Sequence, residues 1–241
     1  MFMCFSSGDR YTAVKSCLYH LKNFGIPVWY DYHELILGDS KIEKNFEHAI
    51  KNNQYFLIIY SDNLFRSPCA MEEEKRIFDE LNRRSITIFP LLYNIKFTDL
   101  PITYQTKLDK YIYNEIDDTK GTLSSINQII TKILIDKINK TTYDKTPNLT
   151  DYKIKSLTDD YIIQLIDLYN HIAKDNFNSR ITMLYCIYYY IKSNYQIKPE
   201  ISYVYQTIEY LFTFTKLNIK YNHKELIIAE LSIIILLNTI F

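Results

Sequence analysis

Apolar and polar residues follow two different patterns along this chain, and the pattern changes near residue 140. Before that point, short continuous apolar runs alternate with longer segments in which apolar residues recur every three or four positions. The runs predict buried strands, and the recurring positions predict helices with one buried face. The predicted strands are Phe2–Phe5, Ile26–Tyr30, Tyr55–Tyr60, Ile86–Tyr93 and a short one at Tyr111–Tyr113.

The segments between these strands have helical spacing. Ser40 and Glu43 stand at the spacing of a capping box, which predicts a helix start. The predicted helices are Tyr11–Phe24 with Val14, Cys17, Leu18 and Leu21 inward, a segment behind Ser40 with Ile42, Phe46, Ala49 and Ile50 inward, then Glu72–Leu81 and Thr122–Ile138. Strands that alternate with helices of this length predict an α/β fold, in which a parallel sheet carries helices on both faces.

Polar loops follow the first three predicted strands. In a parallel sheet the carboxyl ends of the strands meet at one edge, and ligands bind in the crevice outside that edge. The loops Ser6–Arg10, Asp31–Ser40 and Ser61–Glu72 all leave the sheet there. The topology alone therefore predicts that these three loops border one binding site.

Beyond residue 138 the alternation of strands and helices stops. Residues 139–150 are polar, contain Pro147, and are predicted to link a domain at 1–138 to a second one at 151–241. The second domain is predicted to be α-helical, with a role in packing or oligomerisation. Its predicted helices are Leu157–Ala173, Arg180–Ser193, Ile201–Leu217 and Lys224–Phe241, with breaks at Asn176, Asn178, Pro199 and Asn222.

Composition narrows the class of protein. The formal net charge is +0 with pI ≈ 6.9, which argues against a nucleic-acid partner. The four cysteines are widely spaced and form no metal-binding pattern, so we expect no metal and a reducing, cytoplasmic setting. The apolar run Leu226–Phe241 is interrupted by Glu230 and Asn238, and we expect a buried helix there and no membrane association.

Four segments together resemble the TIR (Toll/interleukin-1 receptor) domain family. Met3-Cys-Phe-Ser-Ser-Gly-Asp9 is similar to the family's opening box. Gly25-Ile-Pro-Val-Trp-Tyr-Asp31, followed by Leu35 and Gly38, is similar to its second strand and loop. The segment with Ser67, Cys69 and Glu72 resembles its third motif, and Phe89-Pro-Leu-Leu92 its later strand. The resemblance covers residues 1–138 and implies a flavodoxin-like TIR domain of the bacterial NADase type.

The resemblance also implies an activity, namely NAD+ glycohydrolysis that yields nicotinamide with ADP-ribose or a cyclic or conjugated ADP-ribose signal. NAD+ is then the substrate and no cofactor is needed. Glu72 takes the place of the catalytic acid, with Glu73 as the alternative if the motif is aligned one residue further on. The residues implied to bind NAD+ are Phe5, Ser6, Ser7, Arg10, Trp29, Asp31, His33 and Ser40.

The family's partners follow from the same resemblance. In TIR relatives the loop that corresponds to Asp31–Ser40 docks on a neighbouring TIR domain, so we expect self-association. We further expect a downstream effector that recognises the ADP-ribose product, in antiviral defence. Pro68 stands where the family often has Trp, so an aromatic wall of the pocket is missing or comes from Phe65 or Trp29. That departure favours the alternative hypothesis of a non-catalytic interaction module.

Each of these residues also has an ordinary structural interpretation. Glu72 could be a solvated surface acid and Trp29 a core residue, while Ser6 and Ser7 could cap the first helix. Asp31 could simply end a strand, and Cys69 is interpreted as a packing residue and not a nucleophile. A phosphate-accepting receiver domain would share the sheet topology but needs an acidic pair after the first strand, which Cys4-Phe-Ser6 does not offer.

Overall fold

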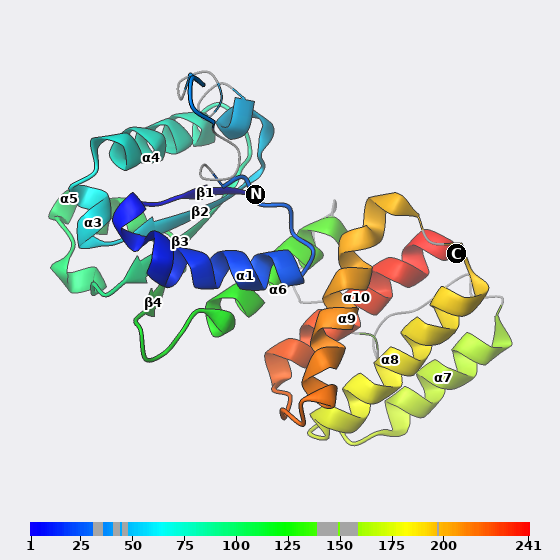
Figure 1. Ribbon diagram of the computed structural model, residues 1–241. Coiled ribbons are helices and arrows are strands. Elements are labelled where there is room, and N and C mark those ends of the chain that lie inside the picture. Colours follow the sequence, from blue (N-terminus) through cyan, green and yellow to red (C-terminus); the bar gives the residue numbers. More distant parts are fainter. Residues whose placement is uncertain (31–35, 41–43, 45–47, 139–148, 150–158, 197) are drawn as a thin grey trace. The chain divides into compact units, whose positions relative to one another are not determined.

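The computed structural model describes residues 1–30, 36–40, 44, 48–138, 149, 159–196 and 198–241. Tertiary contacts among these residues divide the chain into two compact units (Figure 1). The first unit comprises Met1–Lys22 and Ile26–Ile126, and the second comprises Asn23–Gly25 and Asn127–Phe241. The predicted linker at 139–150 lies outside the described residues except for Leu149, and the predicted domain boundaries stay a prediction.

The first unit is built on a parallel sheet. Within the described residues the strand order is β1-β2-β3-β4, and every pair is parallel. The strands are β1 (Phe2–Cys4), β2 (Tyr55–Tyr60), β3 (Thr87–Tyr93) and β4 (Asn114–Ile116). Trp29 adds a parallel bridge to Phe2 on the free side of β1. If that segment is counted as the second strand, the order is 2-1-3-4-5, which is the flavodoxin-like order and confirms the predicted fold class.

Two predicted strands differ in extent from the observed ones. Ile26–Tyr30 is reduced to the single bridge at Trp29, because Pro27 in its middle has no N–H to donate to a ladder. The last strand lies at Asn114–Ile116, after the predicted Tyr111–Tyr113, because Tyr111 still belongs to the turn that follows a helix; its N–H donates to the Leu108 carbonyl.

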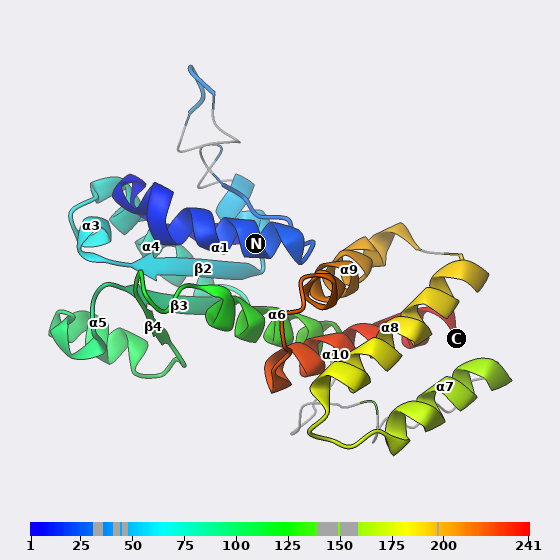
Figure 2. The same cartoon turned by 60° about the horizontal axis from the view of Figure 1, so that its bottom comes forward.

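Helices cover both faces of the sheet (Figures 1 and 2). On one side lies α1 (Lys15–Asn23), which continues from a 3-10 turn η1 (Ser7–Asp9) and a π-helical segment η2 (Arg10–Val14). On the other side lies α4 (Pro68–Leu81). The remaining elements of this unit are α3 (Asp62–Phe65), η4 (Phe97–Asp99), α5 (Ile102–Leu108) and the start of α6 (Leu123–Ile138).

The two cores of this unit follow from strand periodicity. Successive side chains of β2 point to opposite faces, so Phe56, Ile58 and Tyr60 share one face. These three are fully buried in one cluster with Ala70 and Ile77 of α4. Leu57 and Ile59 are turned the other way and are equally buried. The inward residues predicted for the first helix are buried too; they are Val14 at the end of η2 and Cys17, Leu18 and Leu21 of α1. The apolar face predicted for the first helix is therefore confirmed.

Helix α4 begins earlier than the sequence pattern predicts. Ser67 is its N-cap, and the Ser67 hydroxyl accepts a hydrogen bond from the Ala70 N–H over 3.3 Å. Pro68 follows at the first helical position, where its fixed φ fits and its missing N–H is not needed. Glu72 therefore lies in the second turn of the helix, and not at its start.

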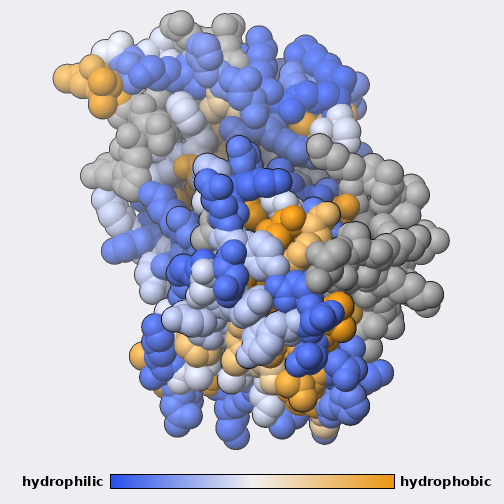
Figure 3. Space-filling view, turned by 90° about the vertical axis from the view of Figure 1, so that its right-hand side faces the viewer, coloured by the Kyte–Doolittle hydropathy of each residue, from blue (hydrophilic) through white to orange (hydrophobic). Residues whose placement is uncertain are grey.

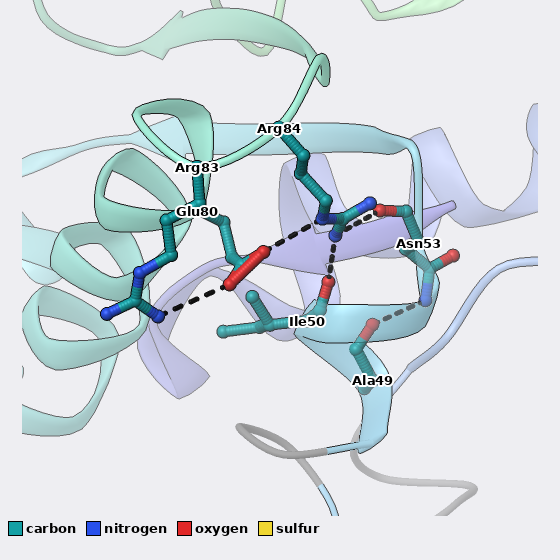
Figure 4. A network of polar contacts seen from close by, with 6 residues as sticks. All are labelled: Ala49, Ile50, Asn53, Glu80, Arg83 and Arg84. Atoms are coloured by element: carbon teal, nitrogen blue, oxygen red, sulfur yellow. Dashed lines mark hydrogen bonds and ion pairs between the residues drawn. The ribbon is translucent and has the colours of Figure 1, made fainter.

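Arg84, just after α4, ties the end of this helix to the helical residues 48–52 that precede β2 (Figure 4). Its guanidinium donates to the carbonyls of Ile50 (2.7 Å) and Asn53 (2.8 Å) and to the Glu80 carboxylate (2.8 Å). Arginine thus satisfies carbonyls that the helix end leaves open. Ala49 and Ile50 are buried as predicted, whereas Ile42 and Phe46 lie outside the described residues.

The second unit is α-helical, as predicted. Its main helices are α7 (Asp160–His171), α8 (Phe177–Asn194), α9 (Ser202–Lys216) and α10 (His223–Ile240), with a 3-10 turn η5 (Pro199–Ile201) before α9. The predicted breaks at Asn176 and Asn222 are N-caps, and Asn222 forms a capping box with Glu225.

Helix α10 is buried along almost its whole length, from Glu225 to Leu237, apart from Ile227. It packs against α8 and α9 within this unit. A helix that is apolar on all sides needs such a position in the core.

In the view of Figure 3, polar side chains make up most of the visible surface, with apolar side chains in small groups between them. Among the described residues, no helix has the length and apolar character to span a bilayer.

One charged cluster lies inside the second unit. Arg180 and Glu230 are 4% and 5% exposed, and the Arg180 guanidinium donates to the Glu230 carboxylate over 3.2 Å. Tyr169, fully buried, donates its hydroxyl to the same carboxylate and accepts from Arg180 Nε over 3.1 Å. Arg180 also donates to the Ile172 carbonyl over 3.1 Å. Two protein donors thus share one oxygen of the buried Glu230 carboxylate.

Candidate functional site

A cleft with a volume of about 120 Å³ opens beside β1, Trp29 and the first turns of α4. The location agrees with the rule that ligands bind at the carboxyl edge of a parallel sheet, near the point where the strand order reverses. It also agrees with the convergence of loops that the sequence predicts. The residues that line the cleft are Phe2, Met3, Phe5, Ser7, Arg10, Trp29, Ser67, Cys69, Ala70 and Glu73.

Three consecutive glutamates of α4 lie in three different environments. Successive helical residues point about 100° apart. Glu74 is 2% exposed and accepts hydrogen bonds from the Tyr60 hydroxyl (2.9 Å) and from Lys107 Nζ (2.6 Å). Glu73 is 7% exposed and lines the cleft. Glu72 lies outside it, with its side chain 41% exposed and its carboxylate 2.7 Å from Arg76 Nε.

Glu72 therefore does not reach the cleft that the sequence predicts for it. It borders a separate surface groove with Lys51, Lys75 and Arg76. The physical reason is the register of α4, which begins at Pro68 and buries Ala70 and Ile77. With those positions inward, the residue whose carboxylate points to the cleft is Glu73, the alternative considered from the sequence.

Two thiols lie near the Glu73 carboxylate. Cys69 Sγ is 4.0 Å from Glu73 Oε1, and Cys69 is exposed at the cleft. Cys4 is fully buried at the end of β1, and its thiol donates to the Ala70 carbonyl over 3.5 Å. Burial, followed by the charges of Glu73 and Glu74, raises the pKa of Cys4 well above its ordinary value. Cys4 consequently remains a neutral thiol and not a nucleophile at neutral pH.

The loop after β1 supplies the polar wall of the cleft. Arg10 is half-buried and Ser7 is exposed, and both line it. Asp9, between them, is 1% exposed and accepts hydrogen bonds from Ser61 Oγ (2.5 Å) and Asn63 Nδ2 (2.7 Å). These contacts fasten the loop to the turn after β2, and they hold Ser7 and Arg10 at the cleft.

Gly8 makes this close approach feasible. A Cβ atom at Gly8 would lie 2.9 Å from Asn63 Cγ, closer than real side chains come. The segment that begins after Asp9 is kinked at Thr12, which has non-helical φ/ψ values of −110° and −111°.

Aromatic residues form the rest of the wall. Trp29 is half-buried and lines the cleft, as does Phe5, whose ring stacks on Tyr30 with centroids 5.6 Å apart. Phe65 instead packs in the core against Tyr104, with ring centroids 4.9 Å apart. Of the two aromatic residues considered as replacements for the missing Trp, Trp29 is therefore the one at the cleft.

The other predicted ligand-binding residues are distributed differently. Ser6 is 5% exposed, and its hydroxyl caps η1 by accepting from the Gly8 N–H over 3.4 Å, so the capping interpretation holds for Ser6. Ser40 is exposed and is not among the cleft residues. Asp31 and His33 lie outside the described residues. The structure thus brings Phe5, Ser7, Arg10 and Trp29 together with Glu73, whereas Ser6, Ser40 and Glu72 are not among the residues that line the cleft.

The arrangement combines a shielded carboxylate, a guanidinium, a hydroxyl and an indole ring. A carboxylate in such surroundings stabilises a developing positive charge strongly, because water screens it little. The guanidinium suits a phosphate group, and the indole face suits a planar ring. Within the described residues, no three His, Cys, Asp or Glu side chains come together in a way that could hold a metal ion.

Comparisons with known proteins place these features in context. A family model described as the TIR domain matches residues 1–121. The probable 2′ cyclic ADP-D-ribose synthase TcpO of Methanobrevibacter olleyae is 29% identical over 100 residues, which are 42% of this chain and 29% of that protein. The 2′ cyclic ADP-D-ribose synthase BtTIR of Bacteroides thetaiotaomicron is 26% identical over 130 residues, 52% of this chain and 45% of that protein.

The matched regions therefore span less than half the length of these two curated relatives. Among solved structures, the TIR domain of the Toll-related receptor TRR-2 from Hydra magnipapillata is 18% identical, with a TM-score of 0.39. That match covers 47% of this chain and 81% of the other.

Proposed function

Because this chain belongs to the TIR domain family, we propose that it cleaves NAD+ between nicotinamide and ribose, with Glu73 as the catalytic carboxylate. The observation that supports the proposal most directly is the position of Glu73, which is 7% exposed in a cleft that also holds Arg10, Ser7 and Trp29. The names of the two curated relatives, both synthases of 2′ cyclic ADP-D-ribose, agree with chemistry on this substrate.

In the proposed reaction the bond from C1′ of the ribose to the pyridinium nitrogen breaks, and its electron pair leaves with neutral nicotinamide. No acid has to protonate this leaving group, because it is already cationic in NAD+. The positive charge then resides on the oxocarbenium-like ribose. The Glu73 carboxylate stabilises that charge electrostatically, in surroundings from which most water is excluded.

The other cleft residues have roles that fit the rest of the substrate. The Arg10 guanidinium would pair with the pyrophosphate, and the Ser7 hydroxyl with a phosphate or ribose oxygen. The indole of Trp29 would lie against the nicotinamide ring. The cleft volume of about 120 Å³ is below the roughly 300 Å³ at which pockets for drug-sized ligands begin, so the adenosine half would extend beyond it.

The product depends on what captures the ribosyl cation. Attack by water gives ADP-ribose and one proton. Attack by a hydroxyl or ring nitrogen of the same molecule gives a cyclic ADP-ribose and also releases one proton. The two curated relatives are named for a cyclic product, and we propose a cyclic ADP-ribose signal for this chain as well.

We further propose self-association through the loop after Trp29. Ile36 and Leu37 are 72% and 107% exposed, although both are large apolar residues. Asp39 shapes this loop, since its carboxylate accepts from the Ile36 N–H (2.9 Å) and from Lys44 Nζ (2.8 Å). Two adjacent apolar side chains on such a turn are suited to contact a second TIR domain. A role in antiviral defence, through an effector that binds the product, completes the proposal.

The test is NAD+ consumption by the purified chain, with the products separated by chromatography. Glu73→Gln should lower turnover by at least about a hundredfold, the size expected when one charge-stabilising group is lost. Glu72→Gln is the matched control, because it removes the neighbouring carboxylate outside the cleft and should leave turnover within about twofold. Equal losses in both variants, or loss in Glu72→Gln alone, would refute the assignment.

The alternative is a TIR module that binds partners without chemistry. The exposed pair Ile36 and Leu37 supports it, because this pair serves docking whether or not the cleft is catalytic. Absence of NAD+ turnover at high protein concentration, where self-association is favoured, would support the module. Loss of self-association in Leu37→Ser with retained turnover of monomers would show that the two functions are separate.

A further inference from the structure

We propose that Lys107 is a positioning residue for the reaction, because it neutralises the buried Glu74 and thereby keeps the neighbouring Glu73 ionised in the cleft. The inference rests on the proposed role of Glu73. It concerns residues that lie behind the cleft: none of Tyr60, Glu74 and Lys107 is among those that line it.

The contacts of Glu74 show why its charge matters. Its Oε1 accepts both the Tyr60 hydroxyl at 2.9 Å and Lys107 Nζ at 2.6 Å, while the residue is 2% exposed. Tyr60 is a neutral donor, so the compensating charge in this contact comes from Lys107. Lys107 Nζ also lies 3.7 Å above the centroid of the Phe78 ring, which fixes its place. The ammonium therefore sits in one defined position on the buried carboxylate.

Cys4 links Glu74 to the cleft. This thiol is fully buried, and Glu73 and Glu74 both contribute to raising its pKa well above the ordinary value, after burial itself. Glu73 and Glu74 are also consecutive residues of α4 and are 7% and 2% exposed, so both carboxylates lie in the same weakly screened region. Because the interior screens charge weakly, a change of charge at Glu74 or Lys107 alters the free energy of ionising the Glu73 carboxyl.

Among the residues that the structure describes, the charged and titratable groups near Glu73 come from several elements. They are Cys4 at the end of β1, Arg10 of η2, Cys69, Glu72 and Glu74 of α4, and, on the far side of Glu74, Tyr60 of β2 with Tyr104 and Lys107 of α5. Tyr60 and Tyr104 have pKa values raised above the ordinary one and stay neutral donors. Of these groups, Lys107 is the cation that contacts Glu74 directly.

The sign of each effect follows from charge. Lys107→Met leaves Glu74 as an uncompensated anion, which disfavours the anion at Glu73 and moves the acid limb of the kcat/KM profile to higher pH. Glu74→Gln leaves Lys107 as an uncompensated cation, which favours the Glu73 anion and moves the limb to lower pH. The double variant removes both charges and should return the limb to its original position. Each single shift should be about one pH unit or more.

The experiment measures kcat/KM for NAD+ between pH 4 and 9, roughly the range in which carboxyl groups titrate in proteins. The variants are Lys107→Met, Glu74→Gln, the double variant and Lys107→Arg, which keeps the cation and should behave as wild type. Lys110→Met is the matched control, because Lys110 is an exposed lysine just beyond α5. A purely structural role predicts lower activity without opposite shifts of the limb, and that result would overturn the inference.

A second readout does not depend on turnover. Cys69 and Cys186 are the exposed cysteines of the chain, and Cys4 and Cys17 are buried. In a Cys186→Ser background, the pH dependence of Cys69 modification by a methanethiosulfonate reports the charge of Glu73, 4.0 Å away. Ionisation of the Cys69 thiol itself gives one inflection in every variant. The second inflection, at lower pH, comes from Glu73; it should disappear in Glu73→Gln and shift with the same signs as above in the Lys107 and Glu74 variants.

This pair of measurements separates the two proposals. Shifts in Cys69 reactivity without any NAD+ turnover would refute the proposed function and retain the charge coupling. Turnover that depends on Glu73 with an unmoved acid limb and unmoved Cys69 inflection in all variants would retain the function and overturn the inference. The double variant guards against misfolding, because it leaves no unpaired buried charge and should fold when a single variant does not.

Discussion

Glu230 in the helical unit and Glu73 in the first unit are both carboxylates withdrawn from water, with exposures of 5% and 7%. They differ in what surrounds them. Arg180 and Tyr169 both donate to one oxygen of Glu230, Oε1. Glu73 faces a cleft shared with Arg10. Burial alone therefore does not mark a functional carboxylate, because the partners of a buried carboxylate can be structural side chains such as Arg180 and Tyr169.

The largest expected effect on stability comes from removing Glu230 from its cluster with Arg180 and Tyr169. Glu230→Leu leaves Arg180 buried without its carboxylate, and removing one partner of a buried pair costs about 3–5 kcal/mol. We expect amide hydrogens of α8 and α10 to lose protection by a corresponding factor in hydrogen exchange. NAD+ turnover by the protein that remains folded should not change. A decrease of less than about 1 kcal/mol in the free energy of opening would show that Arg180 and Glu230 do not form a stabilising buried pair.

The double variant Arg180→Met/Glu230→Leu sharpens this result. It removes both charges, so most of the lost protection in α8 and α10 should return. The single tryptophan, Trp29, provides an internal control, because it belongs to the first unit. Its fluorescence transition in urea should stay unchanged in both variants.

Glu80 is an intermediate case, since arginines bind it at the edge of the fold (Figure 4). Hydrogen bonds from Arg84 are the main cause that lowers the pKa of Glu80 below its ordinary value of 4.5. A lowered pKa means that the ionised side chain stabilises the folded state above pH 4.5 and that this contribution is lost as the pH falls through the lowered pKa. We therefore expect Glu80→Gln to cost about 1–2 kcal/mol at pH 7.

The measurement is urea unfolding followed by Trp29 fluorescence, at several pH values. The difference between Glu80→Gln and wild type should be constant near neutral pH and should disappear in acid. Asp79→Asn on the same helix serves as the control. A difference that grows on acidification would contradict the expected sign.

A smaller effect on the free energy of unfolding is expected beside Asp9, a buried carboxylate in the loop next to the cleft. Asp9 is 1% exposed and accepts from Ser61 and Asn63, so it resembles Glu230 more than Glu73. Gly8→Ala places a Cβ 2.9 Å from Asn63 Cγ, and the Asn63 side chain must move away. Loss of that one hydrogen bond should cost about 1 kcal/mol in urea unfolding. In an Asn63→Ala background the same substitution should cost less, because the clashing amide is gone.

The smallest effect on stability is expected at the carboxylate that lines the cleft. Glu73→Leu removes a charge from the cleft, and its loss should change the free energy of unfolding by no more than about 0.5 kcal/mol, or should stabilise the fold. Thermal unfolding monitored through Trp29 measures this. A loss of about 3 kcal/mol or more, similar to that expected for Glu230, would show that Glu73 stabilises the fold as Glu230 does.

Much of the fold could be predicted from the sequence, because periodicity reports which face of an element is buried. The run Tyr55–Tyr60 is observed as a strand with the predicted bounds, and the four C-terminal helices lie close to the predicted ranges. The short helices α3 and α5 could not be predicted, since a few residues give no detectable period. The sequence also does not predict the cluster of Arg180, Glu230 and Tyr169, because these residues come from three separate helices.

The sequence predicts part of the residues that line the cleft, and their roles stay a prediction. The loops that converge and the residues Phe5, Ser7, Arg10 and Trp29 follow from strand order and from the family resemblance. The register of the glutamates does not, because the predicted helix begins at Glu72 instead of Pro68. The sequence nonetheless contains a signal. Ala70 and Ile77 are two helical turns apart on the buried face of α4, and the residues between them on that face are Glu73 and Glu74, not Glu72.

The run of three identical residues at 72–74 has a consequence for inheritance. Deletion of any one of the three glutamates gives the same protein sequence. In a helix each deleted residue turns everything that follows by about 100° relative to what precedes it. One lost codon would therefore rotate Ile77 out of the core relative to Ala70 and leave two acidic side chains for three environments. Lineages that carry this cleft should accordingly keep the length of this stretch constant even where its neighbours drift.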